Sequence, residues 1–101
     1  MVTRIAKSTA KGWLANVPED KVFWCSDGRV LKNLAALEIA LREMNDDTFR
    51  YHANDSKNDF SKWVKDVIGD EKLSRDLQKS ANRAQAAKNV ASRIAFLKEK
   101  V

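Results

Sequence analysis

The chain contains one histidine and one cysteine, and these two side chains are the best suited to chemistry. His52 stands in a stretch rich in aspartate, so an imidazole and two carboxylates could together hold a metal ion. Zinc sites, however, draw most of their ligands from several histidines or cysteines. A calcium loop counted from Asn54 would place Asp59 where a glycine is needed and Lys65 where a glutamate is needed. The sequence therefore predicts no metal site.

Cys25 and His52 could also form a nucleophile and its general base, an arrangement that needs hydrogen-bond contact and an activated thiol. Cys25 instead ends the apolar run Val22–Cys25, and cysteine in such a run usually behaves as a small buried apolar side chain. The three glycines are too far apart to form a phosphate-binding loop or a dinucleotide-binding turn. We therefore predict no catalytic residue, no cofactor and no enzymatic activity.

The stretch from Thr48 to Gly69 combines aromatic side chains with short polar ones, and this combination has two interpretations. Asn, Asp and Ser side chains can cap helices and bind nearby backbone groups, which would make the stretch a structural corner. Aromatic walls beside amide groups can also form a recognition pocket for a peptide, a sugar or a base. The candidate recognition residues are Tyr51, His52, Asn54, Asn58, Asp59 and Trp63.

Basic residues gather at the two ends of the chain, although the net charge is only +5. Residues 1–12 carry a net charge of +3, residues 13–78 carry −3, and residues 79–101 carry +5. Basic ends attract phosphate groups, so non-specific association with nucleic acid is the alternative function that the sequence supports. The candidate phosphate contacts are Lys7, Lys11, Lys79, Arg83, Lys88 and Arg93.

Local signals predict how the first half of the chain folds. Asp27 and Gly28 stand between two apolar runs, which is a hairpin signal because glycine tolerates a positive φ. Asn33 is a suitable N-cap for a leucine-rich helix that ends near Met44. A second, short helix is expected to contain residues 48–52.

The second half of the chain is expected to contain three more helices. Ser56 and Asp59 resemble a capping box, which predicts that a helix starts there. Gly69 is expected to end this helix, and Asp70 to cap the next one. The last helix should run from about residue 82 to residue 100.

These elements predict a mainly α fold: one compact domain of four or five helices with a small N-terminal β-hairpin or extended segment. Residues 1–16 would form a partly flexible N-terminal arm, and residues 17–101 a single helical domain that ends in the basic helix. Apolar side chains recur at spacings of three and four, which is the helical period. The expected core is Phe23, Leu34, Leu37, Leu41, Phe49, Phe60, Trp63, Val64, Val67, Leu73, Leu77, Ile94 and Leu97.

Residues 23–44 and 48–77 carry a pattern that runs from Asp-Gly and Asn-Leu through Tyr-His and Asn-Asp-Phe to Trp. The positions that carry it are Phe23, Asp27, Gly28, Asn33, Leu34, Phe49, Tyr51, His52, Asn54, Asn58, Asp59, Phe60, Trp63, Asp66 and Val67. In this pattern the chain resembles a small prokaryotic domain of unknown function. The resemblance implies one compact domain in a prokaryotic, cytosolic setting, and it implies no activity.

The sequence also limits where the protein acts. No stretch approaches the roughly 18 consecutive apolar residues of a membrane-spanning helix, and the N-terminus lacks the apolar run of a signal peptide. We therefore expect a cytoplasmic protein without a membrane partner. Its expected function is that of a non-enzymatic binding or interaction module, whose partner is an unknown protein or a second copy of the chain. Nucleic acid is the partner under the alternative function.

Overall fold

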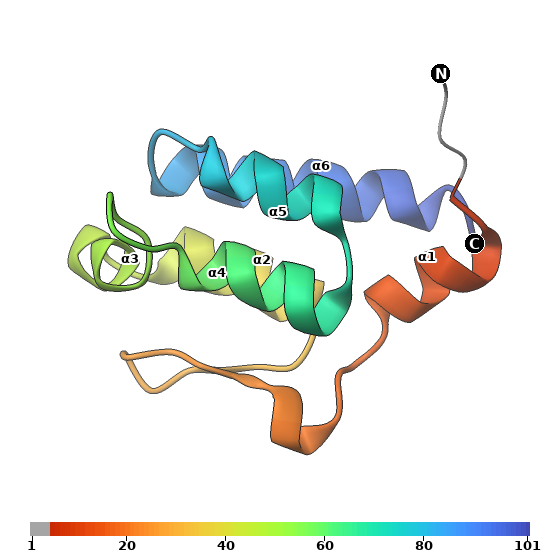
Figure 1. Ribbon diagram of the computed structural model, residues 1–101, viewed down its shortest axis with the longest axis horizontal. Helices are drawn as coiled ribbons and strands as arrows, with labels where there is room; N and C mark the ends of the chain where they lie inside the picture. The colour runs from red at the N-terminus through yellow and green to blue at the C-terminus, as the bar shows by residue number, and fades with distance from the viewer. Residues whose placement is uncertain (1–4) are drawn as a thin grey trace.

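Helix dominates the computed structural model, which describes residues 5–101 (Figure 1). The α-helices among these residues are α1 (Lys7–Leu14), α2 (Leu34–Glu43), α3 (Asp46–His52), α4 (Asp59–Trp63), α5 (Glu71–Gln78) and α6 (Arg83–Lys98). A 3₁₀ turn, η1 (Glu19–Lys21), precedes an antiparallel hairpin of β1 (Phe23–Trp24) and β2 (Val30–Leu31). The predicted mainly α fold with a small N-terminal hairpin is therefore confirmed.

Asparagine or aspartate side chains start every one of these α-helices except α1. Each N-cap oxygen accepts a hydrogen bond from the backbone N–H three residues later, which satisfies a donor that the first helical turn leaves free. The N-caps are Asn33, Asn45, Asn58, Asp70 and Asn82. The caps predicted at Asn33 and Asp70 are confirmed.

The capping box predicted at Ser56 and Asp59 is wrong. Ser56 donates its backbone N–H to the side chain of Asn54 at 2.9 Å, so it belongs to the turn that precedes α4. Asn58 takes the cap position instead, and its Nδ2 also reaches the carbonyl oxygen of Leu77 at 3.3 Å. One asparagine thus starts α4 and fastens it to the end of α5.

Helix α4 widens at its C-terminal end into a π-helical turn, η2 (Val64–Ile68). The carbonyl oxygen of Val64 accepts a hydrogen bond from the N–H of Gly69, five residues later, at 2.7 Å. The wider turn changes which side chains face the core. Ile68, four residues after Val64, is therefore buried together with Val64. Val67, which the helical period predicted to be in the core, is only partly buried for this reason.

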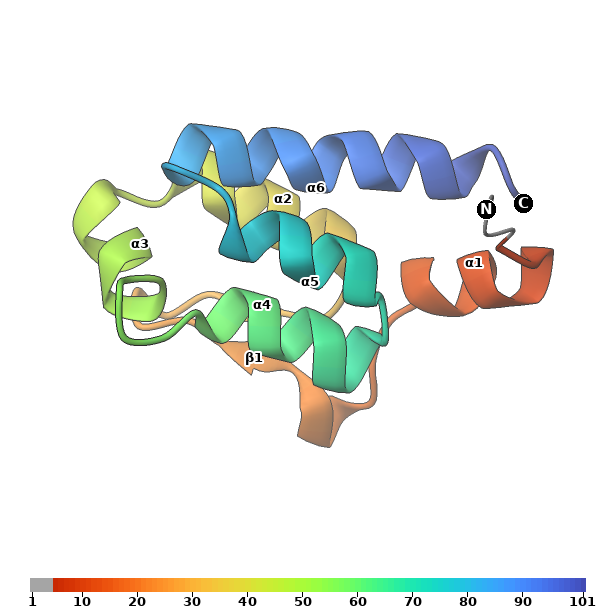
Figure 2. The ribbon, with the colours of Figure 1, turned by 45° about the horizontal axis from the view of Figure 1, so that its top comes forward.

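The core lies where α6 crosses α2 and α5. Figure 2 shows α6 along the top of the molecule, with α5 below it and α4 below α5. Leu34, Leu37 and Leu41 of α2 are fully buried, as are Val90 and Leu97 of α6. The contact between α2 and α6 therefore supplies a large part of the apolar area that leaves water on folding.

Two other expected core residues, Phe49 and Ile94, are also only partly buried. Phe49 lies at the edge, where the short helix α3 stacks it on Phe60 with ring centroids 5.9 Å apart. On α6 the neighbouring residue Arg93 takes the inward position, because it binds the buried Asp70. Ile94 is displaced toward the rim of the core as a consequence.

The N-terminal arm contains α1, which packs against the C-terminal half of α6 (Figures 1 and 2). Ala10 is fully buried in this contact, and the backbone N–H of Val17 donates to the carbonyl oxygen of Lys32 at 2.8 Å. The arm is thus fastened at α1 and again beside the hairpin. Residues 1–4, part of the segment expected to be flexible, lie outside the described residues.

Two glycines with a positive φ offer a matched comparison. Gly28 closes the hairpin turn with φ of 95°, and Gly69 ends η2 with φ of 98°. A Cβ at Gly28 would meet no atom within 4 Å, whereas a Cβ at Gly69 would lie 3.3 Å from Nε1 of Trp13. Gly69 therefore has a packing role in addition to its conformational one.

We predict that Gly69→Ala destabilises the protein more than Gly28→Ala. Both substitutions place a side chain in the left-handed region, at about 1–2 kcal/mol each. Only Gly69→Ala also forces the indole of Trp13 to move. Urea unfolding of the two variants measures the difference, and equal losses in the free energy of unfolding would contradict a packing role for Gly69.

Candidate functional site

His52 is buried and has a hydrogen bond at each ring nitrogen. Nε2 accepts from the backbone N–H of Ser26 at 2.9 Å, and Nδ1 therefore carries the proton and donates to Asp59 Oδ2 at 3.0 Å. The ring also contacts Phe23 and Phe60, with centroids 5.1 and 5.3 Å away. His52 thus joins the turn of the hairpin to the start of α4, and neither nitrogen is free to take a proton from a substrate.

Asp59 completes this contact. Partial burial raises the pKa of its carboxyl, but the hydrogen bonds from His52 and Lys57 lower it more, so the pKa lies below the ordinary value of 3.8. The carboxylate is therefore charged at neutral pH and holds the Nδ1–H tautomer of His52.

The other candidate recognition residues lie in separate places. Trp63 is buried, and its Nε1 donates to the carbonyl oxygen of Lys21 at 2.8 Å. Asn54 donates to the carbonyl oxygen of Arg50 at 2.8 Å and shapes the turn before α4. Tyr51 is 61% exposed. The structure therefore does not bring the six residues into one pocket, and all of them except Tyr51 form hydrogen bonds with other protein groups.

Cys25 is buried beside the hairpin turn. Burial raises the pKa of its thiol above 9.0, which leaves the reactive thiolate scarce at neutral pH. Within residues 5–101, no three His, Cys, Asp or Glu side chains are grouped so that they could hold a metal ion. Over the same residues, no helix has the length and apolar character needed to cross a membrane.

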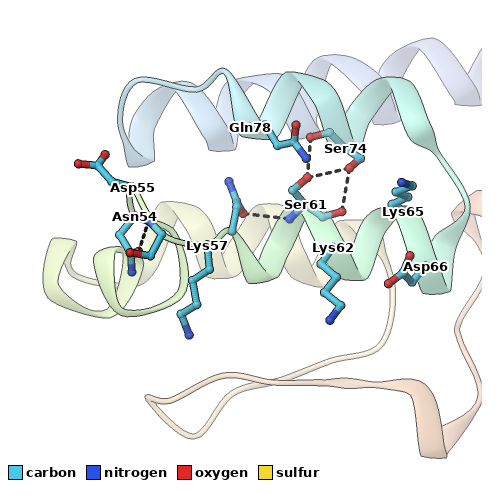
Figure 3. A pocket seen from close by; sticks show the side chains of 11 residues that line it. Asn54, Asp55, Lys57, Ser61, Lys62, Lys65, Asp66, Ser74 and Gln78 are labelled. Atoms are coloured by element: carbon cyan, nitrogen blue, oxygen red, sulfur yellow. Dashed lines mark hydrogen bonds between the residues drawn. The ribbon is translucent and has the colours of Figure 1, made fainter.

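A polar groove of about 530 Å³ lies on the outer side of α4 and α5 (Figure 3). Its floor is formed by Ser61 and Ser74, whose hydroxyls each donate to the other's carbonyl oxygen at 2.9 Å. Figure 3 shows this contact between the two helices, with Lys57 and Lys62 extending away from it. The floor is therefore closed by internal hydrogen bonds, and at the rim Lys57 pairs with Asp59 while Lys62 is exposed to solvent.

Arg93, a candidate phosphate contact, belongs to a buried ion pair. Its Nε donates to Asp70 Oδ2 at 2.7 Å and its Nη2 donates to Asp70 Oδ1 at 3.0 Å. Asp70 is fully buried and Arg93 is 9% exposed. The guanidinium also lies 5.7 Å from the ring centroid of Trp13 and 5.1 Å from that of Phe96. Its charge is already neutralised, so we correct its assignment as a nucleic-acid phosphate contact.

Arg83 is likewise held by internal partners. Its Nη1 donates to the carbonyl oxygens of Leu41 and Arg42 at 2.8 and 2.9 Å, and its Nε donates to Asp46 at 3.1 Å. A cation at the C-terminus of α2 satisfies its last carbonyls and opposes its dipole. Arg83 therefore fastens the start of α6 to the end of α2.

The remaining candidate phosphate contacts are exposed lysines that lie far apart. Lys7 and Lys11 are on α1, near the C-terminal end of α6, whereas Lys79 is at the turn before α6 (Figure 1). The 16 residues of α6 separate these two ends by about 24 Å. Lys88 lies between them on α6 itself. The basic ends of the chain therefore do not converge on one compact surface.

A second groove, of about 810 Å³, lies between α1, the start of α5 and the C-terminal half of α6. Its apolar walls are Ile5, Trp13 and Phe96, and the guanidinium of Arg93 lies within 6 Å of both aromatic rings. Its polar lining includes both signs of charge: Asp70, Glu71, Asp76, Lys72, Arg75 and Arg93. Aromatic walls beside a fixed arginine make this groove the strongest candidate for a recognition site among the described residues.

Few features of the sequence indicate that its residues form this groove. Asp70 was expected only as a helix cap and Arg93 only as part of a basic face. Trp13 stands 80 positions from Arg93, so their contact depends on how α1 packs on α6. Helical spacing does place Phe96 one turn after Arg93, which was the one available local signal.

Comparisons with protein-family models, curated proteins and solved structures find no match for this chain. The resemblance to a small prokaryotic domain of unknown function therefore stays a prediction. Several residues that carry it have structural roles here: Gly28 shapes a turn, and Asn33 and Asn58 cap helices.

We predict that Asp70→Asn costs about 3–5 kcal/mol of unfolding free energy, because the guanidinium of Arg93 would stay buried without its counter-charge. The matched control is Asp76→Asn in the same helix, where only the exposed pair with Lys72 is lost and the cost is at most about 1 kcal/mol. Denaturant unfolding of both variants measures the costs. Equal values would mean that the buried pair contributes no more than the exposed one.

We predict that Asp59 makes stability depend on acid pH. Its folded pKa lies below its unfolded value of 3.8, so its contribution is fully present above the unfolded pKa and is lost as pH falls through the folded pKa. The stability difference between wild type and Asp59→Asn should therefore shrink as pH is lowered from 5 toward 2, with Asp55→Asn as the control for loss of one negative charge. Urea unfolding across this range measures it, and a constant difference would be the contradicting result.

Proposed function

We propose that the protein is a non-enzymatic binding module that takes a peptide segment of a protein partner in the groove between α1, α5 and α6. The observation that carries the proposal is the guanidinium of Arg93 within 6 Å of the rings of both Trp13 and Phe96, at the wall of an open groove of about 810 Å³. Aromatic and arginine side chains dominate the binding energy of protein interfaces. A concave, partly apolar site is also the usual form of a binding pocket.

Two features support binding without catalysis. His52 uses both ring nitrogens in hydrogen bonds inside the fold, and burial keeps the Cys25 thiol protonated. The groove itself is lined by apolar and charged side chains rather than by a nucleophile next to a base. A free, buried cysteine also suits the cytoplasmic location that we propose.

Non-specific nucleic-acid binding has less support as the function. Arg83 and Arg93 are held by internal partners, and the exposed lysines are spread over the length of α6. If this alternative is correct, duplex or single-stranded nucleic acid should bind at low salt, and the affinity should fall steeply between about 50 and 200 mM salt. Self-association is the other alternative, and light scattering would detect a dimer.

Selection from a displayed peptide library tests the groove. We predict that peptides enriched on the wild type lose about 30-fold or more in affinity for Phe96→Asp, because a charge replaces an aromatic wall. The matched control is Ile39→Asp on α2, which also replaces an exposed apolar residue of a helix and should leave binding unchanged. Circular dichroism checks that both variants are folded. Peptides that bind both variants equally would contradict the groove as the site.

A further inference from the structure

We infer that the groove between α1, α5 and α6 recognises the free C-terminal carboxylate of a peptide that ends in an apolar residue. This inference rests on the proposed function and adds the chemical group that the partner must carry. It follows from the hydrogen-bond donors that the fold leaves unused beside the aromatic walls.

Two such donors face the groove. Arg93 uses Nε and Nη2 for Asp70, and its Nη1 has no partner among residues 5–101. The indole Nε1 of Trp13 also has no partner within those residues. The described part of the chain contains no buried side-chain polar atom without a hydrogen bond, so both nitrogens are accessible to solvent, and both residues line the groove. A ligand there meets these two N–H donors beside Arg75 and Glu71, neither of which has an ion pair among the described residues.

The position of Arg93 makes this donor unusually well fixed. The side chain is nine-tenths buried, two of its nitrogens are anchored, and aromatic rings lie within 6 Å of its guanidinium. The direction of Nη1 is therefore fixed before a ligand binds. Binding to it loses less side-chain entropy than binding to a mobile surface arginine. The N-terminal end of α5 also lies at this groove, because residues 69–72 line it, and the helix dipole adds partial positive charge there.

The charge of the lining selects a singly charged group. Asp70, Glu71 and Asp76 balance Lys72, Arg75 and Arg93, so the formal charge of the lining side chains is zero. A phosphate, with nearly two negative charges, would need several cations that are not already paired. A carboxylate accepts two hydrogen bonds and carries one charge, which fits the two free N–H groups. The apolar walls then select the residue that bears the carboxylate.

The volume favours a peptide over a small acid. About 810 Å³ is far more than one aromatic side chain fills, and it lies near the upper end of the range for small-molecule pockets. A peptide terminus would place its last side chain against Ile5, Trp13 and Phe96 and continue along the groove toward Asn89. The same carboxylate chemistry is shared by free aryl-alkanoic acids, so the experiment must separate the two sources.

Titration calorimetry on the full chain with matched probes tests the inference. The probes are an N-acetylated tetrapeptide that ends in phenylalanine with a free carboxylate, the same peptide with an amidated C-terminus, and 3-phenylpropanoate. We expect amidation to weaken binding about 10- to 100-fold, which corresponds to the loss of a charged hydrogen-bond acceptor. We expect 3-phenylpropanoate to bind more weakly than the free peptide.

Glu71→Gln provides an independent readout on the protein. No ion pair holds Glu71 among the described residues, so it is the rim carboxylate expected to repel the ligand, and its neutralisation should strengthen binding of the free peptide about two- to fivefold. The amidated peptide should not respond. Lys79→Gln, an exposed charge change at the far end of α6, should alter neither.

The outcomes separate the two proposals. Equal affinities for the free and amidated peptides, both lost in Phe96→Asp, would overturn the carboxylate inference and leave the groove as a binding site. Equal affinities for 3-phenylpropanoate and the free peptide would support the carboxylate site and overturn a peptide as its occupant. If none of the probes binds and the library yields no peptide that depends on Phe96, both the inference and the proposed function fail.

Discussion

The ion pair between Asp70 and Arg93 is the interaction on which one half of the fold depends. A fully buried carboxylate is strongly unfavourable unless its charge and its lone pairs are matched. Asp70 meets this requirement with two hydrogen bonds from Arg93 and one from the N–H of Leu73. The same side chain therefore starts α5 and binds α6. The π-helical turn that ends at Gly69 places Asp70 at this position. The ring of Trp13 in α1 lies close to the guanidinium of the pair.

The opposite end of the molecule uses neutral and charged side chains for the same purpose. His52 connects the hairpin turn to Asp59, Asn58 connects the start of α4 to the end of α5, and Arg83 connects α6 to α2. Each contact fastens the end of one element to a neighbouring element. Polar and charged side chains in this part of the chain are thus used mainly to hold loops and helix ends, and His52 is one of them.

Local features of the fold were predictable because local interactions produce them. Asn33 caps a helix through a contact three residues away, and Asp27-Gly28 makes a turn through the φ of one glycine. Position in the core was less predictable where a tertiary contact overrides the helical period. Ile94 lost the inward position because Arg93, its neighbour, reaches a carboxylate 23 residues earlier in the chain. No spacing rule connects those two residues, so a basic helix face and a helix cap were the interpretations available from sequence.

The pairing of Arg93 with Asp70 also explains how a stabilising contact can supply a recognition group. In this ion pair the carboxylate accepts hydrogen bonds from Nε and from one terminal nitrogen of the guanidinium. Because the guanidinium is planar, its other terminal nitrogen points away from the carboxylate. In this fold Arg93 lines the groove, and the rings of Trp13 and Phe96 both lie within 6 Å of its guanidinium. The buried aspartate keeps the arginine in place and cancels its long-range attraction for phosphate. Under the inferred function, what remains is a short-range, directional donor beside apolar walls, and the groove would discriminate by shape and by a single acceptor group rather than by net charge.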